Sequence, residues 1–185
     1  MNWDDKREVK KGDLGESICR SLLESDKYVV YEAVTKKAHL IDFFCHRESK
    51  EIIGAEVKSK RRTKKCFWGD VPGTGFDIRH YKEYLHLQEK HNIEIKMFFV
   101  DEYEELIYGG WLSDLMNNAI KVKDVVLFRL DEMDIFYKLS ETQVSNLKAL
   151  SRSKQDYEGV KAYFNQKKKV IKNPMQGKLF NHWDI

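Results

Sequence analysis

The segments Leu40-Ile41-Asp42-Phe43-Phe44 and Gly54-Ala55-Glu56-Val57-Lys58 are two apolar stretches that each carry an acidic residue. β-Branched and aromatic residues bounded by polar ones are typical of β-strands. The polar segment Arg47-Glu48-Ser49-Lys50 between them predicts a hairpin turn. If this turn is centred on its serine, Asp42 lies opposite Glu56. Directly opposed residues of neighbouring strands have Cβ atoms about 5 Å apart, so the sequence predicts a close pair of carboxylates.

Alternation of side chains along a strand places Glu56 and Lys58 on one face and Val57 on the other. Asp42 has apolar neighbours on both sides, which is the pattern of a central, buried strand. A buried carboxylate without a partner is costly. Two interpretations follow. Either a divalent cation lies between the two carboxylates, or Asp42 forms a structural ion pair with Lys58.

A helix is predicted near the N-terminus, where apolar residues recur at helical spacing: Leu14, Ile18, Cys19, Leu22 and Leu23. Glu16 falls at the rim of this apolar arc. From the rim, its carboxylate either faces a cleft beside the sheet or is an ordinary first-turn glutamate favoured by the helix dipole.

These segments together resemble the catalytic core of the PD-(D/E)xK nuclease superfamily. Its signature is an aspartate on one strand and Glu-x-Lys on the next, preceded by a helix that bears a glutamate. Asp42, Glu56-Val57-Lys58 and Gly12-Asp13-Leu14-Gly15-Glu16 fit these three parts, although Ile41 replaces the namesake proline. The resemblance covers roughly residues 11–115. It implies an α/β fold with a restriction-endonuclease-like core, a mixed central sheet flanked by helices.

The resemblance also implies roles for the site residues. Asp42, Glu56 and the carbonyl of Val57 would hold Mg²⁺, with Mn²⁺ as a substitute, and Glu16 would bind a second metal directly or through water. Hard oxygen ligands suit Mg²⁺. Lys58 would orient or deprotonate the attacking water, whose pKa the metal lowers.

A further site residue is expected on the helix predicted over Asp77–His91. The superfamily often places a basic residue, Gln or Tyr there, facing the site. The candidates are Arg79, His80, Lys82 and Gln88. Gln88 is preferred as a catalytic residue because it lies on the same stripe as the apolar residues of the helix.

Basic residues are concentrated directly after the Glu56 strand, where six of the eight positions 58–65 are Lys or Arg. Because these basic residues directly follow the strand of the predicted site, we expect them to contact phosphates rather than to form plain solvated surface. Residues 61–75, rich in glycine, are predicted to form an irregular, mobile loop. Trp68 in this loop either stacks on bases or pins the loop to the core. The expected nucleic-acid contacts are Lys60, Arg61, Arg62, Lys64, Lys65, Trp68 and Arg79.

The rest of the chain extends this layout. Strands are predicted at 93–100, 106–110 and within 122–137, and helices at 111–115, 140–150 and 156–166. A helical crossover from the Glu56 strand to the strand at 93–100 makes the sheet mixed. The expected organisation is a nuclease-like core over 1–138, peripheral helices over 139–170 and a tail over 171–185.

The tail holds Gln176, Leu179 and Phe180 at the spacing Gln-x-x-Leu-Phe. This spacing resembles the peptide by which many replication and repair enzymes dock on a sliding clamp, although Gly177 stands where leucine is usual. Extended peptides of this kind insert apolar anchors into a groove. Trp183 favours the alternative, in which the tail packs on its own core.

Composition places the chain among ordinary globular proteins. It has 185 residues, 42% of them hydrophobic, and a net charge of +3. Its three cysteines show no zinc-ligand spacing, and no apolar run approaches the roughly 20 residues that span a bilayer. A reducing cytoplasm is therefore expected, that of the host if the gene is viral.

The function expected from sequence is a metal-dependent DNA nuclease, structure- or end-directed, acting in phage or bacterial replication, recombination or repair. The alternative is a non-catalytic DNA-binding or scaffold protein that retains the fold. Both would bind DNA, and only the first would cleave it.

Overall fold

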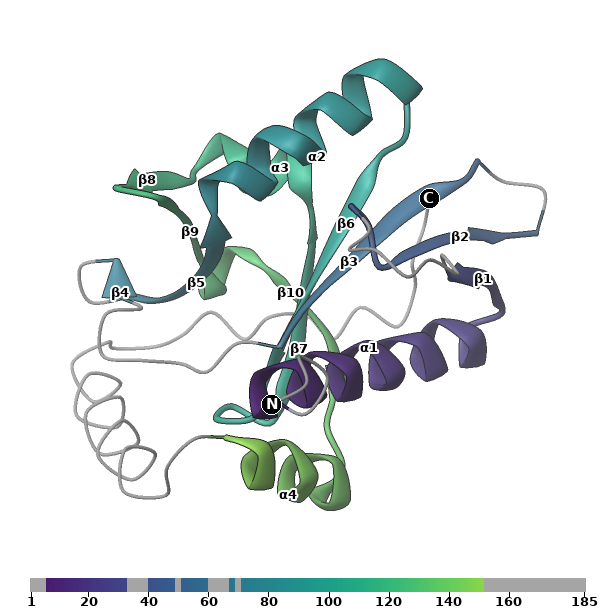
Figure 1. The fold of residues 1–185 in the computed structure, drawn as a ribbon, viewed down its shortest axis with the longest axis vertical. Coiled ribbons are helices and arrows are strands. Elements are labelled where there is room, and N and C mark those ends of the chain that lie inside the picture. The colour runs from purple at the N-terminus through teal and green to yellow at the C-terminus, as the bar shows by residue number, and fades with distance from the viewer. Residues whose placement is uncertain (1–5, 33–39, 49–50, 60–66, 69–70, 152–185) are drawn as a thin grey trace.

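The computed structural model describes residues 6–32, 40–48, 51–59, 67–68 and 71–151. A six-stranded sheet forms its centre (Figure 1). The strands lie in the order β1 (Tyr28–Glu32), β2 (Phe43–Arg47), β3 (Ile53–Ser59), β6 (Ile95–Asp101), β7 (Leu106–Trp111) and β10 (Asp134–Lys138).

The sheet is mixed, as the sequence predicts. β1, β2 and β3 run antiparallel, and β3 pairs with β6 in parallel. β7 and β10 then continue antiparallel. A parallel pair needs a crossover connection, and α2 (Ile78–His91) lies within the connection between β3 and β6. β3 and β6 are buried on both faces, as expected for the centre of a covered sheet.

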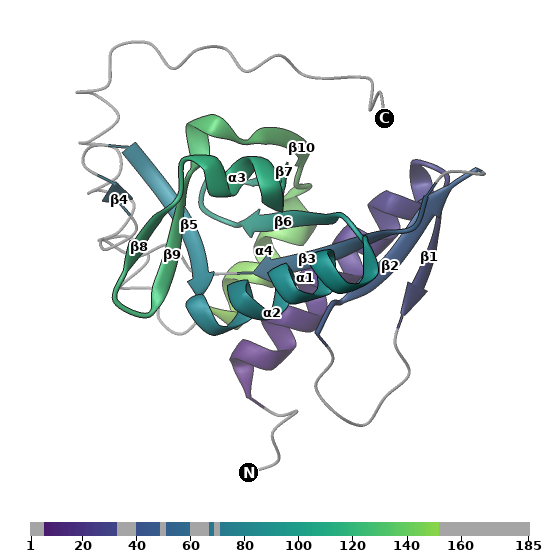
Figure 2. The same cartoon turned by 90° about the horizontal axis from the view of Figure 1, so that it is seen from above.

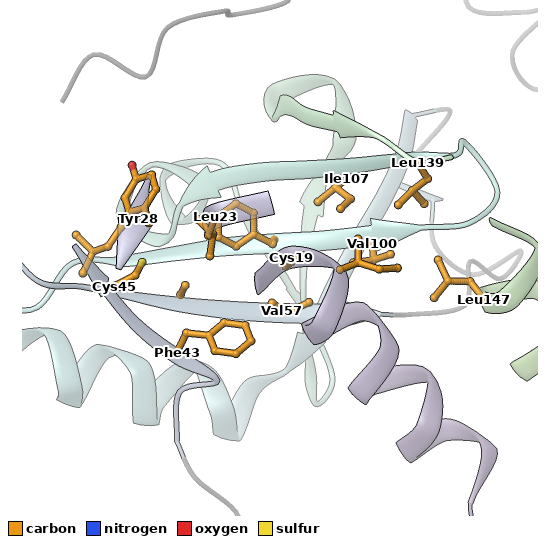
Figure 3. Close-up of a cluster of buried hydrophobic side chains, with 14 of the residues drawn as sticks. Cys19, Leu23, Tyr28, Phe43, Cys45, Val57, Val100, Ile107, Leu139 and Leu147 are labelled. Carbon is orange, nitrogen blue, oxygen red and sulfur yellow. The ribbon is translucent and has the colours of Figure 1, made fainter. Parts of the chain in front are cut away.

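One face of the sheet is covered by α1 (Arg7–Ser25) and α4 (Glu141–Leu150), which lie on the same side in Figure 1. Figure 3 shows the buried cluster beneath them, in which Cys19 and Leu23 of α1 meet Val57 and Val100 of the sheet. α4 begins with a capping box formed by Ser140 and Gln143, and its Leu147 is fully buried in the same cluster.

The opposite face is covered by α2, α3 (Leu112–Asn117) and a second, four-stranded sheet. The second sheet has the order β4 (Phe67–Trp68), β5 (Val71–Asp77), β9 (Val125–Arg129) and β8 (Ile120–Val122), and the short helix η2 (Leu130–Glu132) follows β9. Tyr84, Phe76 and Phe128 join these elements in a second buried cluster. Helices and the small sheet thus flank the central sheet on both faces.

The sequence predicts an irregular loop over residues 61–75. This prediction is wrong from residue 71 onward, where the strand β5 begins. Residues 73–77 of β5 pair with β9 in an antiparallel register. A Cβ built at Gly75 would lie 2.9 Å from the carbonyl carbon of Val126. Glycine is needed there because two backbones approach closely, a recognised reason for glycine within a strand. The glycines of this segment had led to the prediction of a loop.

A buried ion pair joins α1 to the turn after β6. Lys11 Nζ lies 2.7 Å from Glu102 Oε1, and both side chains are almost completely buried. Ser151, directly after α4, donates its hydroxyl to Glu102 Oε1 at 2.8 Å and accepts from Lys11. Three segments far apart in the sequence are therefore held together by one polar cluster.

The predicted helix at 156–166 and the tail at 171–185 lie outside the described residues. The expected core boundary at residue 138 coincides with the last residue of β10. No helix in the part of the chain that the structure describes is long and apolar enough to cross a membrane.

Candidate active site

The hairpin of β2 and β3 has the register that the sequence predicts. Phe43 pairs with Ala55, Phe44 with Gly54 and Cys45 with Ile53, so each pair is centred on position 49. The same register continued by one residue sets Asp42, directly before β2, opposite Glu56.

Two hydrogen bonds hold these opposed residues together. The Val57 N–H donates to Asp42 Oδ2 at 2.7 Å, and the Asp42 N–H donates to Glu56 Oε2 at 3.3 Å. Asp42 is 9% exposed and Glu56 only 3%. The structure therefore brings together the two buried carboxylates that the sequence places in one site.

Lys58 lies on the same face of β3 and forms an ion pair with Glu56 Oε1. Its side chain is 19% exposed, more than that of its partner. Of the two readings of Asp42, the ion pair with Lys58 was the structural one. In the structure, Lys58 forms its ion pair with Glu56 instead.

Burial and neighbouring charge act strongly on Asp42. Burial, followed by the carboxylates of Glu56 and Glu16, raises the pKa of its carboxyl to about 8, against the opposing effects of the Val57 N–H and Lys58. A carboxyl so placed holds its proton near neutral pH unless positive charge arrives. This is the electrostatic setting that a cation would relieve.

Glu16 reaches this environment from α1. The side chain is partly buried, and its charge contributes to the raised pKa of Asp42. Gly15 makes the approach possible, since a Cβ there would lie 2.9 Å from the Cβ of Ser59 at the end of β3. The glycine lets α1 cross close to the strand that carries Glu56 and Lys58.

Tyr84 of α2 is a site residue that sequence reasoning missed. Its hydroxyl donates to Glu56 Oε1 at 2.6 Å, and its side chain is fully buried. Burial, with the nearby charge of Glu56, raises the pKa of Tyr84, so it remains a donor. Gln88 lies one turn further along α2 and is partly buried. Among the described residues of α2, the side chain bonded to Glu56 is that of Tyr84.

A signal for Tyr84 was present in the sequence. It lies three residues after Tyr81 and four before Gln88, on the same helical stripe. The superfamily pattern admits a tyrosine on this helix, but Tyr84 was not among the candidates, and only the packed structure shows which residue on that stripe reaches β3.

The expected nucleic-acid contacts are mostly outside the description. The undescribed segment 60–66 contains five of them, Lys60, Arg61, Arg62, Lys64 and Lys65, and the side chain of Trp68 is not described either. The undescribed C-terminus contains the three residues of the predicted clamp motif, Gln176, Leu179 and Phe180. Arg79 is described. Its guanidinium is bonded to Asp77, the N-cap of α2, while its side chain stays 81% exposed.

The oxygen donors of the site fit the ligand requirements of Mg²⁺. Asp42 and Glu56 supply carboxylate oxygens, and Val57 is the adjacent residue whose carbonyl is the predicted third ligand. Mg²⁺ characteristically uses one or two protein carboxylates and fills its shell with water and substrate phosphate. Within the described ranges, no three His, Cys, Asp or Glu side chains form a group that could hold a metal ion alone. The residues fit a cation held by few protein ligands.

Comparisons with known proteins add likeness at the level of the fold. No protein-family model and no curated protein matches the sequence. Solved structures similar to this chain include Hjc, a Holliday junction resolvase from Archaeoglobus fulgidus, with a TM-score of 0.46 and 7% identity over 65% of this chain and 90% of that one. Another is D212, a nuclease from a fusselovirus, with a TM-score of 0.46 and 11% identity over 85% of this chain and 98% of that one. The functional argument rests on the geometry of the site.

Proposed function

We propose that this protein is a metal-dependent nuclease that hydrolyses phosphodiester bonds of DNA. The observation that carries the proposal is the pair Asp42 and Glu56, opposed and buried, with Lys58 on the same strand face as Glu56. Two buried carboxylates gathered this closely are costly for a fold, because each disfavours ionisation of the other. A function that needs a cation between them explains why they are together.

In this proposal Asp42, Glu56 and the carbonyl of Val57 hold Mg²⁺, and Mn²⁺ can substitute. When bound, the metal lowers the pKa of a water molecule and neutralises charge developing on the phosphate. Tyr84 donates to Glu56 and fixes its carboxylate. Lys58 orients or deprotonates the attacking water and contacts the scissile phosphate, whereas Glu16 serves a second metal from the rim of α1.

DNA is the proposed partner, contacted by the basic residues that follow β3 and by Arg79. We favour structure- or end-directed cleavage in replication, recombination or repair. The cytoplasm, or that of the host, is the proposed setting. Docking of Gln176, Leu179 and Phe180 on a sliding clamp stays a prediction, tested by calorimetry of a peptide covering residues 172–185 against a bacterial clamp.

The test of the proposal is cleavage of labelled linear, nicked, single-stranded and branched DNA, each with Mg²⁺, with Mn²⁺ and with EDTA. We expect cleavage that requires the metal and differs among the four DNAs. Lys58→Ala should abolish it, and Lys138→Ala, an exposed lysine of β10, is the matched control that should not.

Equal background in all lanes, insensitive to EDTA and to Lys58→Ala, would leave the non-catalytic DNA-binding protein as the better account. In that case the cluster of Asp42, Glu56, Lys58 and Tyr84 would be a structural polar network.

A further inference from the structure

An exposed aromatic and apolar patch adjoins the candidate site on the same face of the sheet. Side chains directly opposed across neighbouring strands share a face, so the register sets Tyr31 beside Phe44 and Val29 beside His46. Phe44 pairs with Gly54, two residues before Glu56 on β3, so these side chains and the Glu56 carboxylate emerge on one face. We call Val29, Tyr31, Phe44, His46 and Ile52 the platform.

The platform is open to solvent. Val29 is 47% exposed, and Tyr31 and Ile52 are each 51% exposed. Figure 2 shows β1 at the outer edge of the central sheet. Large exposed apolar side chains that gather on one face mark a binding surface more often than scattered ones do.

Two rings on the platform are held in a fixed arrangement. Tyr31 and His46 stack with centroids 5.8 Å apart and an interplanar angle of 22°. His46 Nδ1–H donates to the carbonyl of Glu48 at 2.9 Å, since a carbonyl only accepts. The Tyr31 hydroxyl lies 3.2 Å from His46 Nε2. Both ring nitrogens are thereby engaged, so the two rings form a preformed stacked pair.

We propose that this platform binds unpaired bases of the DNA substrate by stacking, next to the phosphate that is cleaved. The inference rests on the proposed function. Successive residues on one strand face are about 7 Å apart, so a nucleotide flanking a phosphate held at Asp42 lies within reach of Tyr31. Bases in a duplex already stack on each other, and an unpaired base has a free face for an aromatic ring. The favoured substrate is therefore DNA with a single-stranded end or flap.

A second copy of the chain is the competing occupant, and the size of the patch argues against it. A stable protein interface uses about 20–30 residues from each partner. The platform has five residues, two of them half-buried. A nucleotide base needs only one or two aromatic rings on which to stack.

The experiment measures binding in EDTA, where no cleavage occurs, by fluorescence anisotropy of three labelled DNAs. The first is a duplex with a thymidine overhang, the second the same duplex with an abasic overhang, and the third the blunt duplex. The abasic overhang keeps the phosphates and lacks the bases. Tyr31→Ile is compared with wild type because isoleucine preserves strand propensity and apolar character but removes the ring.

We expect Tyr31→Ile to weaken binding of the thymidine overhang roughly ten-fold, as loss of base–aromatic stacking does elsewhere. Binding of the abasic and blunt DNAs should be unchanged. Tyr31→Trp should keep the preference for thymidine, because it keeps a ring. Tyr137→Ile, a 38% exposed tyrosine on β10 at the opposite edge of the same sheet, is the matched control and should behave as wild type.

If Tyr31→Ile leaves the affinity for the thymidine overhang unchanged, or lowers the affinity for all three DNAs equally, the proposal that the platform binds bases is overturned. A dimer in sedimentation that Tyr31→Ile converts to a monomer would overturn it too. A different result would contradict the proposed function. If wild type cleaves no DNA with Mg²⁺ while the base-dependent binding holds, the nuclease proposal falls and the platform stands.

Discussion

The carboxyl of Asp42 is buried and has two acidic neighbours, Glu56 and Glu16, two conditions that both disfavour its ionised form. Burial, together with the charges of Glu56 and Glu16, raises its pKa to about 8. Its ordinary pKa in an unfolded chain is about 3.9. The folded protein therefore binds this proton more tightly than the unfolded chain, and the stabilisation is complete below about pH 4 and lost as pH rises towards 8.

Asp42→Asn should accordingly stabilise the metal-free protein, increasingly from pH 5 to pH 8. Asparagine keeps an oxygen that can accept from the Val57 N–H but carries no charge. At pH 8 the gain should be on the order of a few kcal/mol. Thermal unfolding in EDTA across this pH range measures it. A difference that is absent, or that shrinks as pH rises, would mean that Asp42 is not held protonated by its surroundings.

Tyr84→Phe should lower cleavage about ten-fold while leaving the fold intact. The ring that packs edge-on against Phe76 is preserved, and only the hydrogen bond to Glu56 is lost. A hydrogen bond to a charged group contributes about 1.5–3 kcal/mol. Part of the loss should be recovered at higher Mg²⁺, since Glu56 is proposed as a metal ligand. Tyr81→Phe, on the same helix, is the control, and equal rates for both variants would confine Tyr84 to packing.

Helix α1 contains two glycines with opposite surroundings. A Cβ at Gly12 would meet only Glu16 Oε1, at 3.9 Å, whereas one at Gly15 would be crowded by Ser59 of β3. Gly12→Ala should stabilise by about 0.5–1 kcal/mol through helix propensity. Gly15→Ala should destabilise by about 1–3 kcal/mol through overpacking. Urea unfolding of the two variants checks this, and equal effects would mean that α1 does not lie against β3.

The same elements show what sequence could and could not predict. The hairpin of β2 and β3 was predictable because alternation and a local turn determine its register. The start of α4 was predictable because Ser140 and Gln143 cap it locally. β5 was missed because glycine within a strand reads as a loop until the partner strand is known. Tyr84 was missed for a similar reason, since its contact with Glu56 depends on tertiary packing.

At the scale of the whole molecule, the candidate site lies between the central sheet and the layer formed by α2 and the second sheet. Tyr84 links the two, bonded to Glu56 of β3 and packed against Phe76 of β5. The site is thus built from segments distant in the chain. The spacing of the sequence motif predicted only the part of the site that lies on β2 and β3.

Charge acts on DNA binding at this same scale. Changing Lys60, Arg61, Arg62, Lys64 and Lys65 together to alanine should weaken DNA binding and flatten its dependence on salt, because each phosphate contact releases counterions. Metal binding, measured by calorimetry with Mn²⁺, should be unaffected. A salt slope identical to that of wild type would show that these five residues only face solvent.

The central claim is that Asp42, Glu56 and Lys58 form a metal-dependent cleavage site, and single-turnover cleavage of one DNA across a Mg²⁺ titration tests it most directly. Alanine at any of the three should reduce the rate on the order of 10²-fold or more. Glu16→Ala should reduce it less and recover partly as Mg²⁺ rises. Glu141→Ala, an exposed glutamate of α4, is the control. Near-wild-type cleavage by the Asp42, Glu56 or Lys58 variant would contradict the account.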